Sequence, residues 1–227
     1  MSEVSTIKLQ WDLSGEREYE LGVSKGVLFP MANGAYQAGV AWNGLTSVEE
    51  NPDGADINDI WADNIKYASF QSPENHKGTI KAYMFPNEFY PCNGMVSPEG
   101  MEGLTYSGQP RSPFGLCYRT EIGTDTDEAA GYKLHFVYNC KVRPSSRAHN
   151  TKNENPDPEE MSWEYSSTPV PVTGVTGVTQ TSTVEVKSTD FTDAQMKALE
   201  KVVYGFGETD ARLPMPGEIK TIIASAA

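Results

Sequence analysis

The chain of 227 residues has few cysteines, and none of them forms a C-x-x-C pair. Cys92, Cys117 and Cys140 are odd in number and lie far apart, whereas a disulfide framework in a secreted chain uses an even count. A structural zinc site would show ligands paired a few residues apart, which this spacing does not offer. We therefore expect three buried, inert thiols and no resident cofactor.

Long apolar runs are also missing from the sequence. No segment approaches the roughly 18 apolar residues of a membrane-spanning helix, and the first thirty residues hold no apolar core of signal-peptide length. We expect the chain to be made in a cytoplasm, to stay reduced there, and not to bind a membrane.

Basic residues are scarce compared with acidic ones. The chain has 18 Lys and Arg against 31 Asp and Glu, which gives a formal net charge of -13. Such a balance disfavours attraction to nucleic acid or to anionic lipid, since both would be repelled at low salt. An acidic surface also serves ordinary solubility, so charge by itself does not identify a function.

Catalytic and metal-binding motifs are not found. His76, His135 and His149 are scattered, and the sequence contains no H-E-x-x-H, G-x-S-x-G or phosphate-cradling glycine loop. Acidic side chains gather near residues 53–63 and 125–128, but neither group has the order of a calcium loop. We interpret both as solvated turns and expect no enzymatic activity.

Strand patterns dominate what the sequence does contain. Period-two alternation of apolar and polar residues predicts half-buried strands. It occurs at residues 7–13, 80–84, 116–122, 132–142, 161–165 and 184–186. In the strand over 132–142, Tyr132, Leu134, Phe136, Tyr138, Cys140 and Val142 are expected to share one face, with His135 on the other and Val137 as an exception. The acidic segment 123–131 then forms a hairpin loop.

One helix is predicted, over about Thr192 to Tyr204. Thr192 and Gln195 form a capping box, the apolar residues that follow have helical spacing, and Gly205 ends the helix. The segment from Asp56 to Tyr67 fits either a helix face or a strand. We therefore expect an all-β fold with one flanking α-helix in a single domain over 1–227.

Two stretches are predicted to be long loops. Residues 86–113 hold five prolines and four glycines, and residues 145–160 have almost no apolar content. Structureless loops longer than about 12–15 residues usually have a function or are disordered. Aromatic side chains are plentiful, with 4 Trp, 11 Tyr and 8 Phe. We expect most of them in the core and leave open a sugar-binding platform or a subunit contact.

Several segments, in this order and spacing, resemble the major tail (tail tube) proteins of long-tailed, siphovirus-type phages of Gram-positive bacteria. The central one is ADNIKYASFQSPENHKGTIKAYMFPNEFYPCNG, which reads as strand, turn, strand and a short helical turn after Pro86. The others are Gly22–Pro30, Gly39–Asp56, Ser112–Glu128, Gly131–Ser145, Met161–Gly174 and Ala211–Ile219. The resemblance favours a strand over Asp59 to Phe70.

The resemblance implies a tail-tube-like β-sandwich or barrel, related to the tube proteins of type VI secretion systems. It implies a structural virion protein, assembled in the host cytoplasm, whose hexameric rings stack into a tail tube. Its partners would be further copies, the tape measure and tail terminator proteins, and phage DNA that passes through the lumen without specific binding. Residues 86–113 and 145–160 would make ring-to-ring contacts.

Subunit contacts are the only site that this family implies. The candidate contact residues are Trp42, Asp63, Asn64, Ile65, Tyr67, Phe89, Tyr90, Arg111, His149 and Asn150. The alternative is a β-sandwich carbohydrate-binding or adhesion module on the virion surface, which would use exposed Trp and Tyr. A hydrolase on an all-β scaffold is a further alternative that the scattered histidines disfavour.

Overall fold

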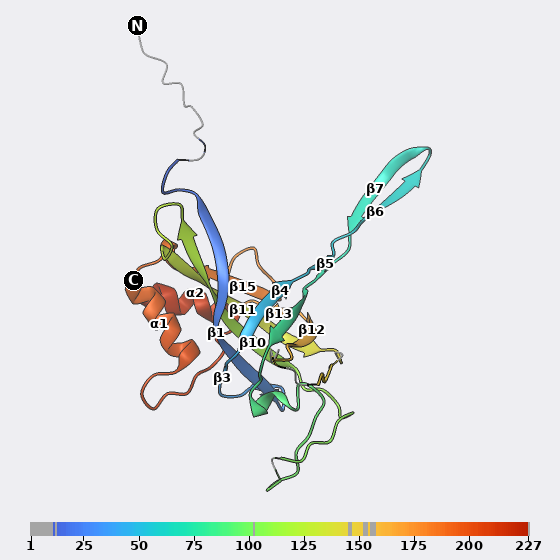
Figure 1. The fold of residues 1–227 in the computed structure, drawn as a ribbon. Coiled ribbons are helices and arrows are strands. Elements are labelled where there is room, and N and C mark those ends of the chain that lie inside the picture. Colours follow the sequence, from blue (N-terminus) through green and yellow to red (C-terminus); the bar gives the residue numbers. More distant parts are fainter. Residues whose placement is uncertain are drawn as a thin grey trace.

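The computed structural model of the protein describes residues 11, 13–101, 103–144, 147–151, 154 and 158–226. The fold is mostly β, with a large antiparallel sheet and two C-terminal helices (Figure 1). The strands are β1 (Glu18–Ala32), β2 (Ala35–Tyr36), β3 (Val40–Trp42), β4 (Leu45–Glu50), β5 (Asp53–Gly54), β6 (Ile57–Ala62), β7 (Ile65–Gln71), β8 (Glu74–Asn75), β9 (Lys77–Ala82), β10 (Phe114–Thr124), β11 (Gly131–Val142), β12 (Met161–Ser167), β13 (Val170–Pro171), β14 (Gln180–Thr181) and β15 (Thr183–Lys187). The helices are α1 (Asp193–Tyr204) and α2 (Pro216–Ser225), with 3-10 turns at Asn87–Phe89 and Ser188–Asp190.

In the described part of the chain, the large sheet has nine strands. Its main order is β2-β1-β10-β11-β12-β9-β4, with β3 paired to β1 and β15 paired to β11. Every pair in it is antiparallel. The sheet curls, so that β4 at one end comes near β1, which is next to the last strand at the other end, yet within the described residues it does not close into a barrel.

Two apolar clusters cover the two faces of this sheet. The first lies inside the curl and is rich in aromatic rings, among them Trp42, Phe89, Phe114 and Trp163. The rings of Phe89 and Trp163 are 5.3 Å apart in an edge-to-face arrangement, a favourable geometry for aromatic pairs. The second cluster lies between β1, β10 and β11 and the two helices, with Phe136, Leu199 and Ile219 among its buried members. The sheet is therefore the shared layer between two cores.

Strand β11 differs from its prediction in one respect. Leu134, Phe136 and Tyr138 face the helices as expected, but Cys140 and Val142 belong to the cluster inside the curl, on the same side as Val137. The side switches at Asn139, whose φ of 49° breaks the alternation, and the β10–β11 pairing shifts register between Phe114 and Leu116. His135 is buried inside the curl and not exposed on a polar face.

The predicted helix is confirmed as α1, and a second helix was not predicted. Thr192 caps α1 through the expected box with Gln195, and Gly205 ends it. The prediction of one flanking helix was wrong, because Pro216 opens α2. Proline is favoured at the first helical position, where its fixed φ fits and its missing N–H costs nothing. Ile219 and Ile223 of α2 are buried in the second cluster.

The other predictions about elements have mixed outcomes. The single strand over Asp59 to Phe70 is instead a hairpin, since a turn at Asp63 and Asn64 separates β6 from β7. Described residues between 86 and 113 form a long loop with a 3-10 turn after Pro86. The predicted strand over 7–13 lies largely outside the described residues, as does much of the loop over 145–160. No helix in the described ranges is long and apolar enough to cross a membrane.

Candidate assembly surfaces

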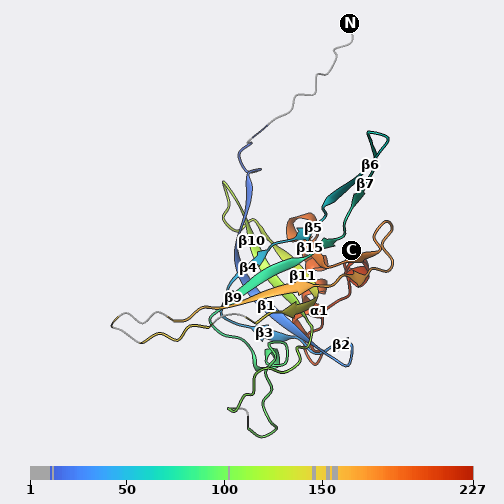
Figure 2. The ribbon, with the colours of Figure 1, turned by 90° about the vertical axis from the view of Figure 1, so that its right-hand side faces the viewer.

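Strands β6 and β7 form an arm, residues 57–71, that projects from the body of the molecule (Figures 1 and 2). The two strands pair only with each other among the described residues. Asp63 and Asn64 make the connecting turn with φ values of 50° and 61°, the left-handed conformation that two-residue hairpin turns require. Asx side chains tolerate this region better than most, so the local sequence suits a tight reversal.

The arm has one nearly all-apolar face. Directly opposed residues in an antiparallel pair share a face. The pairs Asn58–Phe70, Ile60–Ala68 and Ala62–Ile65 therefore lie on one side of the arm, which we call the apolar face. The other face is more polar, because Lys66 Nζ lies 2.8 Å from Asp59 Oδ1 and Ser69 donates to the same oxygen.

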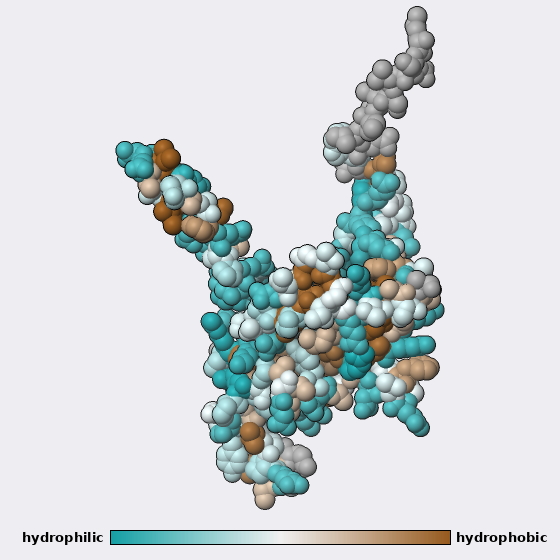
Figure 3. Space-filling view, turned by 180° about the vertical axis from the view of Figure 1, so that it is seen from behind, coloured by the Kyte–Doolittle hydropathy of each residue, from teal (hydrophilic) through white to brown (hydrophobic). Residues whose placement is uncertain are grey.

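The apolar side chains of the arm are open to solvent. Six large residues are between 49% and 71% exposed, and Figure 3 shows hydrophobic surface along the arm. They are Ile57, Ile60, Trp61, Ile65, Tyr67 and Phe70. A lone two-stranded hairpin is at best marginally stable in water, and clustered exposed apolar residues mark interaction surfaces. The arm is therefore suited to be covered by another molecule.

Backbone bonds at its base fix the direction of the arm. Ser72 N–H donates to the Asp56 carbonyl at 2.9 Å, and Asp56 N–H donates to the Ser72 hydroxyl at 2.9 Å. Gly54 has a φ of 93°, and a Cβ there would lie 2.5 Å from the Pro73 carbonyl oxygen, so only glycine fits. The arm is thus connected to the body of the molecule by the short paired strands β5 and β8 and not by an unpaired linker.

A second apolar projection extends from the opposite end of the molecule (Figures 1 and 2). It is the loop that follows the 3-10 turn, in which Val96 and Tyr106 form an isolated antiparallel bridge. Its exposed apolar residues are Val96, Met101, Leu104 and Tyr106. The arm and this loop give the molecule an apolar projection at each end.

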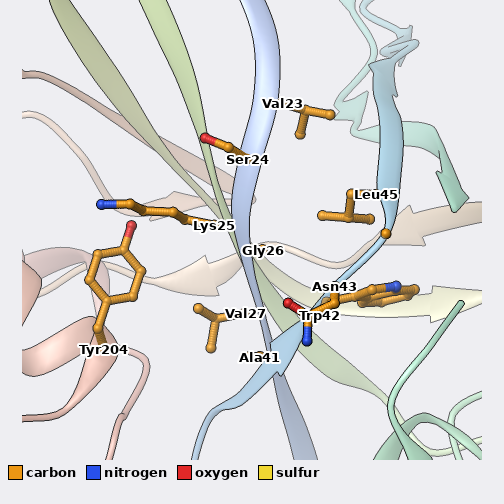
Figure 4. A pocket seen from close by; sticks show the side chains of 11 residues that line it. Val23, Ser24, Lys25, Gly26, Val27, Ala41, Trp42, Asn43, Leu45 and Tyr204 are labelled. Carbon is orange, nitrogen blue, oxygen red and sulfur yellow. The ribbon is translucent and has the colours of Figure 1, made fainter.

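The third feature is an open seam between β1 and β4. Strand β3, which ends at Trp42, pairs with β1. After a turn at Asn43 and Gly44 the chain continues as β4, which from Leu45 onward pairs with β9 and not with β1. Above this point β1 and β4 leave a cleft of about 430 Å³ lined by Val23 and Leu45, with Lys25 and Tyr204 on the other side of β1 (Figure 4). In the described residues no strand pairs with the free edge of β4.

The candidate contact residues fall into four groups. Trp42 and Phe89 are 2% and 0% exposed and pack against each other in the core. Neither side chain can therefore contact a partner in this structure. Asp63, Asn64, Ile65 and Tyr67 are all exposed on the arm. Tyr90 and Arg111 are half-buried at the base of the long loop, where Arg111 donates to the Asn93 carbonyl at 3.3 Å.

His149 and Asn150, the remaining candidates, are exposed in a different loop, where His149 Nδ1 lies 3.2 Å from Glu159 Oε2. The structure thus brings four of the ten candidates together, on the arm. Sequence reasoning missed Ile60 and Phe70, whose side chains complete the apolar face. Ile60 lies in the segment from Asp56 to Tyr67, which fits either a helix or a strand by pattern, and without the turn at Asp63 and Asn64 this pattern did not identify a projecting hairpin.

Burial shifts the pKa values of the core thiols and of one histidine. Burial raises the pKa of the Cys92 thiol to about 12 and raises those of Cys117 and Cys140 further, so all three remain protonated. Burial lowers the pKa of His76, which keeps that imidazole neutral. Among the described residues, no group of three or more His, Cys, Asp or Glu could hold a metal ion.

A polar row crosses the inner face of β1, β10, β11 and β15. His135 Nε2 lies 2.9 Å from Thr120 Oγ1 and 3.0 Å from Glu20 Oε1, and its ring stacks on Tyr118 at 4.6 Å. Burial opposes ionisation of Glu20, yet hydrogen bonds from Lys133 and Thr120 hold the pKa of this carboxyl below its ordinary value. The row is therefore linked through His135 Nε2, whereas His135 Nδ1 is buried without a hydrogen-bond partner among the described residues and lies 3.9 Å from Glu185 Oε1.

Comparison of the sequence with models of known protein families and with curated proteins finds no match.

Proposed function

We propose that the protein is a structural subunit that assembles with further copies of itself into stacked rings, as the major component of a phage tail tube. The observation that carries this proposal is the projecting arm with its exposed apolar face. A surface of this kind, held away from the body of the molecule, serves no purpose in an isolated copy and exposes it to aggregation.

The two apolar projections support an assembly that propagates. They differ in sequence and lie at opposite ends of the molecule (Figure 1). A contact between unlike surfaces is head-to-tail, and such contacts generate rings or open filaments and not closed pairs. A tube of stacked rings combines both outcomes.

The finer features of the proposal come from the sequence resemblance described above. They are a sandwich- or barrel-like tube fold, six copies per ring, tape measure and tail terminator proteins as partners, and a place in the virion tail. The net charge of -13 suits a passive conduit, because a lumen lined with carboxylates repels DNA phosphates and leaves the genome free to slide.

A carbohydrate-binding or adhesion module is the second candidate. It is favoured by Trp61 and Tyr67, which are 66% and 71% exposed on the arm, since flat aromatic side chains suit sugar rings. Such a module would need no self-association and would keep the arm free in the working protein.

Sedimentation velocity over a concentration series separates the two candidates. Assembly predicts a concentration-dependent shift from monomer to a discrete multi-subunit species. The rival predicts a monomer at every concentration, together with saturable binding in a glycan array that is lost in Trp61→Ala. A monomer that binds glycan would reject the tube proposal.

A further inference from the structure

The base of the arm is tied to the large sheet through a buried histidine. Strands β5 and β8 pair with each other where the arm meets the body of the molecule, and we call this pair the arm base (Figure 1). His76 is the single residue between β8 and β9, and β9 lies in the large sheet between β12 and β4. A movement of His76 out of its site would therefore displace the arm base.

Three contacts hold the chain at this residue. The Nε2 atom of His76 lies 3.2 Å from the Tyr165 hydroxyl oxygen, and Ser167 N–H donates to the His76 carbonyl at 2.8 Å. Asn51, which follows β4, donates its N–H to the Lys77 carbonyl at 2.7 Å. His76 is 6% exposed, and Tyr165, in the cluster inside the curl, is 2% exposed. The arm base is thus fixed to β12 beside a buried imidazole.

Charged groups from neighbouring strands lie near this histidine. The carboxylates of Glu50 in β4 and Glu74 in β8 both favour a protonated ring. Tyr118 of β10 donates to Glu50 Oε1 at 2.6 Å, and Lys77 of β9 forms an ion pair with Asp53 of β5. The two carboxylates weaken the preference for a neutral ring and do not reverse it, because burial is the larger effect.

Burial makes the ring of His76 resist protonation. Removing an imidazole from water disfavours its charged form, and this lowers the pKa of His76 below its ordinary value of 6.5. A ring that leaves the site for water regains the ordinary value, so an open arm base binds a proton more readily than a closed one. Neutral His76 therefore stabilises the closed arm base fully above about pH 6.5, and this contribution is lost as the pH falls from there toward the lowered pKa.

We propose that His76 is an acid-sensitive anchor of the arm, which fixes the arm base to β12 when its ring is neutral and releases it when the ring takes up a proton. The inference concerns a single chain, and only its consequence for self-association rests on the proposed function. Where the arm carries the contact between copies, acid should weaken that contact without unfolding the sheet.

Amide hydrogen exchange of the full-length protein, followed by mass spectrometry, tests the proposal. The protein is diluted until it is monomeric, and protection factors corrected for intrinsic exchange are compared at pH 7.5 and pH 5.5. The reporters are the N–H groups of Asn51, Ser72 and Ser167, whose carbonyl acceptors lie between residues 56 and 77. The internal reference is the pair of strands β10 and β11 in the middle of the sheet.

The expected size of the effect follows from proton binding to the open state. At pH 5.5, one unit below the ordinary pKa, that binding favours opening by up to about tenfold. Protection of the reporters should therefore fall by about tenfold between the two pH values, while the reference strands keep theirs.

Two variants assign the effect to one side chain. His76→Gln keeps a polar side chain that cannot take up a proton, and it should reduce the change to less than about twofold. The matched control, His149→Gln, removes a histidine whose side chain is 81% exposed, and it should respond as the unsubstituted protein does.

Reporters that keep their protection in acid would overturn the inference, whether or not the variant folds. An equal loss in His76→Gln would overturn it too, because another group would then be responsible, and so would an equal loss in the reference strands. Sedimentation velocity at both pH values separates this inference from the proposed function. Acid release of the arm base in a protein that never associates would reject the proposed function alone. Unchanged protection in a protein that associates at both pH values would reject this inference alone.

Discussion

Replacing three side chains of the apolar face should separate assembly from folding. The change is Ile60→Ser, Ile65→Ser and Phe70→Ser, at residues that are 49%, 62% and 59% exposed in the single chain. Because β6 and β7 pair only with each other among the described residues, and these three side chains are exposed, their replacement should leave the core intact. Surface substitutions of this kind change the free energy of unfolding by about 0.5 kcal/mol or less each.

The cost to assembly follows from the area that a partner would cover. Fully burying an Ile or Phe side chain is worth about 1.5–3 kcal/mol. Roughly half of the surface of each residue is still exposed in the single chain and can be buried by a neighbour. Burying it stabilises the association by about 1 kcal/mol per side chain, or about 3 kcal/mol for the three. This corresponds to a decrease of about a hundredfold in the association constant, at 1.4 kcal/mol per tenfold.

Sedimentation velocity gives the association constant, and urea unfolding of the monomer gives the stability. The control variant, Val178→Ser with Phe206→Ser, removes two apolar side chains outside the arm that are 41% and 67% exposed. This variant should assemble normally. Equal assembly by the arm variant and the unsubstituted protein would refute the reasoning. A large loss of monomer stability would also refute it, since it would mean that the arm side chains stabilise the fold of their own chain.

Three further predictions concern the fold itself. Leu199→Ala in α1, at a fully buried position between helix and sheet, should lower the free energy of unfolding by about 2–5 kcal/mol in urea titration; a cost below 1 kcal/mol would contradict the second core. Hydrogen bonds from Arg212 lower the pKa of the Glu218 carboxyl, so this pair should stabilise the fold above the ordinary pKa of 4.5 and lose its effect as the pH falls through the lowered pKa. Glu218→Gln should therefore remove about 0.5 kcal/mol at neutral pH, as for a largely exposed pair, and leave stability at acidic pH unchanged. Finally, because the pKa values of the buried thiols are raised by burial, no thiol should react with Ellman's reagent in the native protein and all three should react in denaturant; fast reaction of one native thiol would contradict their burial.

Regular patterns in the sequence identified most of the sheet and the first helix. Strands β9, β10, β12 and β15 and the capping box of α1 come from local rules that the tertiary structure did not override. The second helix was not predicted, although Pro216 occupies the first helical position, which favours proline. The face switch in β11 depends on the backbone of Asn139, which alternation cannot indicate.

The arm shows the main limit of reasoning from the sequence. Alternating Ile, Trp and Tyr side chains indicate a face that must be covered, but they do not say whether the same chain or another one covers it. Asp63 and Asn64 are a weaker hairpin signal than Asn-Gly, so the reversal that lifts Ile65 and Phe70 away from the core was not recognised. The exposure of these side chains, on strands that pair with no others among the described residues, makes the arm a candidate contact surface.

Negative-stain electron microscopy of the concentrated, unsubstituted protein tests the central claim most directly. The account predicts annular particles with a central hole, alone or stacked into tubes, and their loss in the Ile60→Ser, Ile65→Ser and Phe70→Ser variant. Particles of single-chain size at every concentration would contradict it.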